Sequence, residues 1–208
     1  MQQSSPTSIF INCPFDAKYL DMFRAIVITV FYTGCIPRCT LEVSDSGQQR
    51  LARILHLIDE CPLGIHDISR TELDEKSQLP RFNMPFELGL FMGAAHFGGA
   101  LHRDKRCLIL DSAPHRYDIF LSDISGCDPV AHSNDIENLI RRVLSWLKRV
   151  LRIPVSISAH ALYNLYKSFD DDFRKMCGER NESCVRMPYE DYPEFTKNVT
   201  EWLRDNVS

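Results

Sequence analysis

The stretch SIFINCPFDAKYLDMFRAIVITVFYTG, residues 8–34, decides the fold because it joins a strand to a helix with almost no loop between them. Residues 8–13 form a short apolar run that Pro14 closes, which is typical of a buried strand. From residue 17 the apolar side chains recur at helical spacing, and the pattern stops at Gly34, a residue type that commonly ends helices. The stretch therefore predicts one β–α unit.

The same alternation continues along the chain. Expected strands cover residues 36–43, 63–69, 105–111 and a short segment near 128–132, and expected helices cover residues 48–61, the segment around Glu87 and residues 135–151. Strands that alternate with helices form right-handed β–α–β units and a mainly parallel sheet. The sequence predicts an α/β fold, flavodoxin-like and doubly wound, with a mainly five-stranded parallel sheet.

The pattern changes after Pro154. Residues 156–205 contain two or three helical segments and no strand-like run. We therefore expect residues 1–153 to form the α/β domain and residues 154–208 to form a helical C-terminal extension.

Composition and charge limit the class of protein. The 208 residues are 44% hydrophobic and 25% charged, with a formal net charge of -4, which is ordinary for a globular protein. Without a basic excess, direct nucleic-acid binding is not expected. The N-terminus lacks the pattern of a secretory signal, and every long apolar run is broken by an acid or a glycine. We expect a cytoplasmic protein that does not enter the membrane.

The eight cysteines include no C-x-x-C pair, and several lie inside apolar strand-like runs. Buried free thiols are favoured over disulfides, because the compartment expected above is reducing. No metal site is expected.

Polar residues follow the first three expected strands: CPFD after the first, EVSDSG after the second and HDISR after the third. In doubly wound sheets, ligands bind beyond the carboxyl ends of the strands, so these groups should lie along one edge. The N-terminus of the helix that contains Glu87 should face the same edge. The polar segment 70–83 is too long for a tight turn and predicts a functional loop.

Glu87 stands in the otherwise apolar segment PRFNMPFELGLFMGAAHFGGAL, residues 80–101. Asn83 is the expected N-cap and Pro85 suits the first turn, so Glu87 should lie at the end of that turn. An acid there could simply complement the helix dipole, which is worth about 0.3–1 kcal/mol. Because its helical neighbours are largely apolar and an unpaired buried carboxylate is costly, a functional carboxylate is the favoured interpretation.

Three segments resemble one superfamily. FELGLFMGAA, residues 86–95, resembles the E-L-G-x-x-x-G-x-A helix of nucleoside 2-deoxyribosyltransferases, whose glutamate is the nucleophile at the sugar carbon. IFINCPFD, residues 9–16, resembles their first strand with its Pro–Phe turn under the nucleoside, and LGIHDIS, residues 63–69, resembles their third strand. TIR domains share this layout and place a catalytic glutamate at the same helix start to cleave NAD. The resemblance covers about residues 8–110.

The resemblance implies a nucleotide-binding domain over residues 1–153 that cleaves an N-glycosidic bond, with Glu87 at the sugar. NAD is the expected substrate rather than a cofactor, and no cofactor is expected. A carboxylate can stabilise or trap the oxocarbenium-like transition state of such a cleavage. The resemblance also implies a role in bacterial stress or antiviral defence and a homo-oligomer that controls activity. Deoxyribosyl transfer or nucleoside cleavage is the alternative reaction.

Further residues are candidates for this site. Asp67 is the second catalytic candidate, either to position sugar hydroxyls or to protonate a departing base; otherwise it caps backbone amides at a strand end. The candidate substrate-binding residues are Pro14, Phe15, Asp16, Arg38, Ser69, Arg81 and Asn83. Among these types, an aromatic ring can stack on a base, a carboxylate can accept a sugar hydrogen bond, and arginines can contact phosphates. The structural alternatives are a core aromatic, a helix N-cap and solvated arginines.

A non-catalytic nucleotide-sensing adaptor is the rival interpretation from another class of protein. It would bind a nucleotide in the same crevice and engage a protein partner through the C-terminal helices. Glu87 separates the two interpretations, because an enzyme should lose turnover but keep ligand binding in Glu87→Gln, whereas an adaptor has no turnover to lose.

Overall fold

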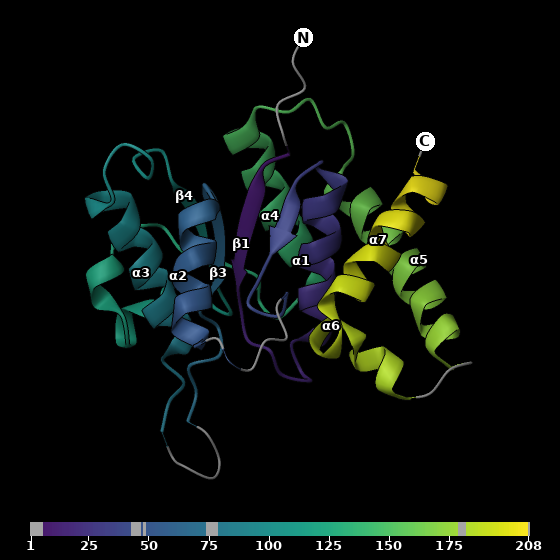
Figure 1. Cartoon of the computed structure of the whole chain (residues 1–208), viewed down its shortest axis with the longest axis horizontal. Helices are drawn as coiled ribbons and strands as arrows, with labels where there is room; N and C mark the ends of the chain where they lie inside the picture. Colours follow the sequence, from purple (N-terminus) through teal and green to yellow (C-terminus); the bar gives the residue numbers. More distant parts are fainter. Residues whose placement is uncertain (1–5, 43–46, 48, 74–78, 179–181, 208) are drawn as a thin grey trace. The chain divides into compact units, whose positions relative to one another are not determined.

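The computed structural model describes residues 6–42, 47, 49–73, 79–178 and 182–207 (Figure 1). Contacts divide the chain into two compact units. Unit 1 consists of Met1–Pro14, Ile36–Thr40 and Asp45–Asn134, and unit 2 consists of Phe15–Cys35, Leu41–Ser44 and Asp135–Ser208. This division differs from the domain boundary expected at residue 153, which stays a prediction.

Within the described part of unit 1 there is one five-stranded sheet. Its strands are β1 (Ser8–Asn12), β2 (Ile36–Arg38), β3 (Leu63–Asp67), β4 (Arg106–Asp111) and β5 (Val130–Ala131). Their order is β2-β1-β3-β4-β5, and every neighbouring pair is parallel. The prediction of a flavodoxin-like α/β fold with a five-stranded parallel sheet and C-terminal helices is confirmed. The second strand is shorter than expected, since it ends at Arg38.

The pairing register determines which side chains share a face of the sheet. Phe10 is level with Gly64, and Asn12 is level with His66. Paired residues of neighbouring strands point to the same face, and successive residues alternate between faces. Phe10, Asn12, Gly64 and His66 therefore share one face, and Asp67 points to the other.

Helices α2 (Arg50–Glu60) and α3 (Asn83–Phe97) pack together on the face that carries Phe10 (Figure 1). Phe10 belongs to one buried cluster with Phe91 of α3 and with apolar side chains of α2. This packing buries one side of each helix, and it is the apolar contact that positions α3 on the sheet.

The helical spacing of Leu51, Ile54, Leu55 and Ile58 predicts that these four residues form the buried face of α2, and this prediction is half right. Ile54 and Ile58 are buried, but Leu51 and Leu55 are 44% and 47% exposed. Helical spacing groups all four residues within one wide stripe, and the structure turns only the half that contains Ile54 and Ile58 toward the core.

Two short 3-10 helices lie between β4 and β5: η1 (Arg116–Ile119) and η2 (Ser122–Ile124). They contribute Tyr117 and Ile124 to a second buried cluster, which includes Met84 and Leu88 of α3. The first half of α3 therefore packs against the β4–β5 connection as well as against the sheet.

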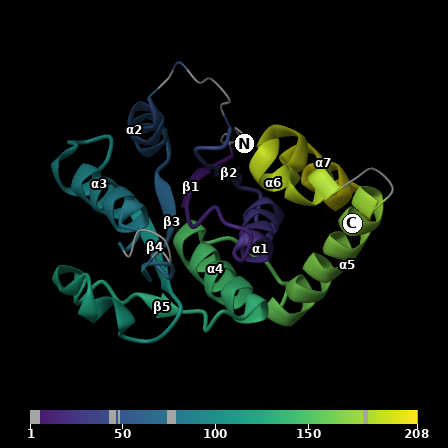
Figure 2. The same ribbon diagram turned by 90° about the horizontal axis from the view of Figure 1, so that it is seen from below.

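Unit 2 is helical in its described residues. It contains α1 (Leu20–Tyr32), α4 (Ile136–Leu151), α5 (Ala159–Gly178), η3 (Glu182–Arg186), α6 (Met187–Glu190) and α7 (Tyr192–Asn206). Figure 2 shows α1 between α4 and the α6–α7 pair. The prediction of two or three helices after residue 156 is confirmed.

Arg24 of α1 is fully buried and is held by acids. It pairs with Asp21 in the preceding turn and, at 2.9 Å, with Asp170 of α5. Arg174 contacts the same two carboxylates, at 2.9 Å and 2.7 Å. A buried guanidinium is tolerated only with such partners, so this network ties α5 to α1.

The expectation of free thiols rather than disulfides is wrong for two of the eight cysteines. Cys177, at the end of α5, forms a disulfide with Cys184 of η3. The other six cysteines are free, and four of them are buried. Spacing alone could not indicate the pair, because C-x6-C is not a metal or redox motif.

No helix in the described ranges is both long and apolar enough to cross a membrane.

Candidate active site

Buried polar side chains gather at the carboxyl ends of the strands in unit 1. Asn12 ends β1, Asp67 ends β3 and Asp111 ends β4, and each is at most 2% exposed. His66 and His132 are buried completely. Buried polar groups need hydrogen-bond partners or a ligand, so the partners of these groups decide what this edge of the sheet can do.

Glu87 lies in the second turn of α3. The helix begins at Asn83 and has no acid in its first turn, so Glu87 lies one residue beyond its expected place at the end of that turn. The expected N-cap is also wrong: Phe82 occupies that position, and its side chain makes no cap hydrogen bond. Glu87 is still close to the N-terminus of the helix, so the burial of its carboxylate and its charged partner distinguish the two interpretations, not its place along the helix.

The carboxylate of Glu87 is buried beside one guanidinium. Its side chain is 5% exposed, and Oε1 lies 3.5 Å from Nη2 of Arg50. Burial raises the pKa of Glu87, and the Arg50 guanidinium opposes that rise. Arg50 is the first residue of α2, so the pattern within α3 could not reveal it.

Asn12 ties the beginning of α3 to the end of β1. Its side-chain Nδ2 donates to the backbone oxygen of Met84 at 2.9 Å and lies 3.1 Å from Nδ1 of His66. Met84 is in the first turn of α3, so this turn lies against the carboxyl ends of β1 and β3. Glu87 follows three residues later, about 4.5 Å farther along the helix axis.

His66 has a structural role in this arrangement. Burial lowers the pKa of His66 to about 3, so its ring is neutral at physiological pH. The amide of Asn12 donates to Nδ1, which leaves the proton on Nε2. The ring lies edge-on to Phe10 and Phe91, and a Cβ on Gly64 would come within 2.6 Å of Nε2. The strand therefore needs glycine at this position to make room for the ring.

Asp67 is fully buried and has partners on both carboxylate oxygens. Oδ1 accepts the backbone N–H of Ser69 at 2.8 Å, and Oδ2 lies 3.1 Å from Nε2 of His132. Nδ1 of His132 accepts the N–H of Asn134 at 3.0 Å, so Nε2 is the nitrogen that faces Asp67, in a close contact without hydrogen-bond geometry. The contact with Ser69 matches the interpretation of Asp67 as a strand-end acid that caps a backbone amide. His132 was missed because residues 67 and 132 are far apart in the sequence.

Asp67 and Glu87 belong to opposite faces of the sheet. The helix that carries Glu87 packs on the face of Phe10 and His66, whereas alternation along β3 turns Asp67 to the other face. The structure therefore brings Asp67 to the same edge as the start of α3 but does not bring its carboxylate to Glu87.

A second carboxylate at this edge, Asp111, was not among the sequence candidates. Nε of Arg116 donates to Oδ1 of Asp111 at 2.7 Å, and the two Nη atoms donate to Thr71 at 3.0 Å and to the backbone oxygen of Ile68 at 2.8 Å. Burial raises the pKa of Asp111, and Arg116 opposes the rise. This arginine clamps the segment after β3 to the end of β4. The sequence feature that could have indicated Asp111 is its place as the acid that ends the strand-like run RCLILD.

The remaining candidates of unit 1 fall in different places. Pro14 is buried two residues beyond β1, and the buried Ser69 has no hydrogen-bond partner for its hydroxyl among the described residues. Arg81 and Asn83 are exposed at the start of α3. Arg38 is level with Phe10, below the edge, and its Nη2 is 3.2 Å from Oε2 of Glu60. Glu60 ends the helix that Arg50 begins, so Arg38 is not near Glu87. Their roles in binding stay predictions.

Phe15 and Asp16 belong to unit 2, and their contacts are structural. Phe15 packs edge-on against Phe23 and Tyr189, at ring separations of 5.5 Å and 5.7 Å. Oδ1 of Asp16 accepts the backbone N–H groups of Lys18 and Tyr19. The contacts of Phe15 correspond to the alternative of a core aromatic. The alternative of a helix N-cap at Asp16 is wrong, because α1 begins at Leu20 with Tyr19 as its N-cap, and Asp16 closes the turn before it.

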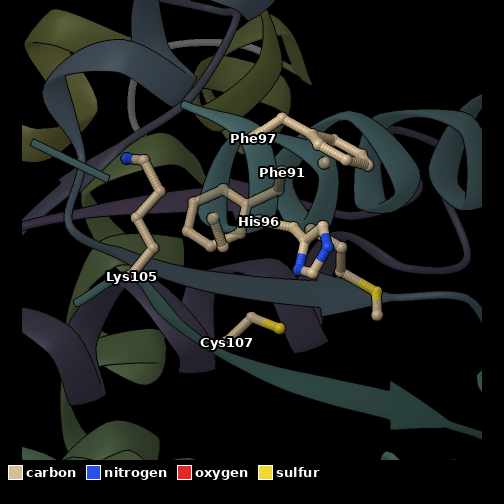
Figure 3. A pocket seen from close by; sticks show the side chains of 8 residues that line it. Phe91, His96, Phe97, Lys105 and Cys107 are labelled. Atoms are coloured by element: carbon tan, nitrogen blue, oxygen red, sulfur yellow. The ribbon is translucent and has the colours of Figure 1, made fainter. Parts of the chain in front are cut away.

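The second half of α3 lines a cavity of about 490 Å³ (Figure 3). The lining residues are Phe91, Met92, Gly93, Ala95, His96, Phe97, Lys105 and Cys107. Its walls are mostly apolar side chains, and Nζ of Lys105 is engaged by the backbone oxygens of Ile58 and Cys61.

This cavity lies at the opposite edge of the sheet from the polar cluster. Lys105 and Cys107 are at the beginning of β4, whereas Asp111 is at its end. Glu87 is not among the residues that line the cavity. This cavity and the candidate carboxylate are therefore separate features.

In the described part of the chain, no group of three or more His, Cys, Asp and Glu side chains is placed to hold a metal ion. No protein-family model, no curated protein and no solved structure matches the chain. The residues themselves are therefore the whole basis for a function.

Proposed function

We propose that the protein hydrolyses the N-glycosidic bond of a nucleotide, NAD before others, with Glu87 as the carboxylate at the sugar. The observation that carries this proposal is the burial of Glu87 at the carboxyl edge of a parallel sheet, with Arg50 as its counter-charge. Burial of a charged group costs stability, and groups with perturbed pKa values are concentrated at functional sites. The resemblance of FELGLFMGAA to a glutamate-bearing helix supports the same role.

The reaction needs little from the protein besides this carboxylate. In NAD the scissile bond joins C1′ of a ribose to the pyridinium nitrogen, and its electron pair stays on that nitrogen when the bond breaks. Nicotinamide then leaves as a neutral base, so no general acid is required. A carboxylate stabilises the positive charge on C1′ or bonds to it. Water adds to C1′ and releases one proton, which gives ADP-ribose.

The position of Asp67 favours NAD over deoxynucleosides. A departing neutral purine or pyrimidine needs a proton from a nearby acid. Both oxygens of Asp67 have partners, and its side chain points to the face of the sheet opposite α3. A structural role at the carboxyl ends of the strands therefore suits Asp67 better than protonation of a base held at Glu87. Deoxyribosyl transfer stays the alternative reaction.

A non-catalytic nucleotide-sensing module is the second candidate. Two observations favour it: Arg50 already balances the charge of Glu87, and Glu87 does not line the 490 Å³ cavity. In this case the Arg50–Glu87 pair holds α2 to α3, and no bond is cleaved.

Base release measured by chromatography distinguishes these functions. The purified full chain is incubated with NAD and, separately, with a panel of deoxynucleosides. Free nicotinamide from NAD supports the proposal, and exchange of bases between deoxynucleosides supports the alternative reaction. No release from either substrate supports the non-catalytic module, for which binding of NAD without turnover is the positive result.

A further inference from the structure

We propose that Arg50 makes the site selective for nucleotides that carry a phosphate, by exchanging Glu87 for that phosphate when the substrate binds. This inference rests on the proposed function, because it assigns a specificity-determining residue to the same reaction. It narrows the substrate class to molecules that offer a cationic glycoside and an anionic group together.

The contact between Arg50 and Glu87 is long, and the two side chains differ greatly in their exposure to solvent. Its atoms are 3.5 Å apart, whereas charge-assisted hydrogen bonds between nitrogen and oxygen are about 2.7–2.9 Å long. The side chain of Glu87 is 5% exposed, but that of Arg50 is 53% exposed. The guanidinium can therefore turn toward an incoming anion, while the carboxylate stays in place.

Arg50 also has donors to spare. A guanidinium carries five N–H groups, and Glu87 is the one partner that Arg50 has among the described residues. Arg116 is different, since Asp111, Thr71 and the backbone of Ile68 occupy its donors. Of these two arginines, only Arg50 can take a phosphate without breaking a network.

An exchange of partners keeps every charge balanced. If Arg50 moved away alone, Glu87 would be left as a buried carboxylate without a counter-charge, which is costly. The pyridinium glycoside of NAD supplies a positive charge at the position that Arg50 vacates, and its pyrophosphate supplies the anion for Arg50. A neutral deoxynucleoside offers neither charge, so the original pair would stay closed.

Two substrates, one with phosphate and one without, test this selectivity. NAD and nicotinamide riboside contain the same cationic base and the same scissile bond, but the riboside lacks the pyrophosphate and the adenosine joined to it. Nicotinamide release from each is measured with the wild-type chain, Arg50→Gln and Arg50→Lys. Arg103→Gln is the control, because Arg103 is an exposed arginine of unit 1 for which the structure shows no partner among the described residues.

We expect Arg50→Gln to raise KM for NAD about tenfold or more, as the loss of a hydrogen bond to a charged group predicts. The KM for nicotinamide riboside should change less than twofold, and Arg50→Lys should recover part of the NAD affinity. An equal change for both substrates would overturn the inference while leaving the proposed function intact, since Arg50 would then act on Glu87 alone. If the wild-type chain releases nicotinamide from neither substrate, the proposed function fails and the selectivity fails with it.

Discussion

At the scale of single residues, Glu87 combines an ionisable group with surroundings that disfavour its charge. Burial raises its pKa above the value of an unfolded chain, and Arg50 only partly opposes this. A group whose pKa is raised on folding binds protons more tightly in the folded state. The folded state therefore loses stability as the pH rises from about 4.5 through the pKa of folded Glu87.

Glu87→Gln should remove this loss. The variant should match or exceed the wild-type free energy of unfolding at pH 7, and the difference between the two should shrink as the pH is lowered toward 4. Urea unfolding from pH 4 to pH 8 measures both effects. Glu201→Gln, the same change at an exposed position of α7, should change neither the stability nor its pH dependence. A large destabilisation in Glu87→Gln at pH 7 would mean that the ion pair with Arg50 is a structural link.

Residues near in sequence and residues near in space contribute differently to what a sequence can predict. Glu87 stands out because a single acid interrupts an apolar helix, which is a local pattern. Arg50 and His132 could not be found in this way, because each contacts a carboxylate that is distant from it in the sequence. Local reasoning identified Glu87 and Asp67, but it missed Asp111 and the charged or ring partners of all three carboxylates.

At the scale of elements, α3 decides where the candidate site lies. One side of the helix enters the core through Phe91, which is 1% exposed, while Phe97 on the same helix is 83% exposed. The sequence predicted the helix itself, but its even distribution of apolar residues gave no indication of which side is buried. The clusters around Phe10 and Met84 settle this question.

The two phenylalanines of α3 provide a matched test of that orientation. Phe91→Ala should lower the free energy of unfolding by about 3–5 kcal/mol, because it leaves a cavity between helix and sheet. Phe97→Ala should change it by less than about 0.5 kcal/mol, since an exposed ring is already solvated. Thermal and urea unfolding measure both. Equal effects would show that α3 packs with another face.

At the scale of the whole molecule, the order of strands and helices was predictable and their contacts were not. Alternation of apolar runs was enough to predict five parallel strands followed by C-terminal helices. The amount of each helix that is buried, the short β2 and the network of Arg24 with two acids depend on tertiary packing, which local periodicity does not contain. The same limit explains why the disulfide was missed.

The Cys177–Cys184 disulfide gives a prediction for the chain as a whole. Its cysteines are seven residues apart, and a loop of that size stabilises the folded state by about 2 kcal/mol in the chain-entropy description. Dithiothreitol should therefore lower the Tm of the wild-type chain. The double variant Cys177→Ala and Cys184→Ala should have the lower Tm from the start and should not respond to the reductant. A wild-type Tm that is the same with and without dithiothreitol would contradict this assignment.

The central claim is that the carboxylate of Glu87 acts on the glycosidic carbon of NAD. The most direct measurement compares nicotinamide release and NAD binding in the wild-type chain, Glu87→Gln and the control Glu201→Gln. We expect Glu87→Gln to bind NAD with an affinity within a few-fold of the wild-type affinity. It should release nicotinamide at least about 100-fold more slowly than the wild-type chain, because it loses the charge that stabilises the transition state. Release by Glu87→Gln at the wild-type rate would contradict the claim.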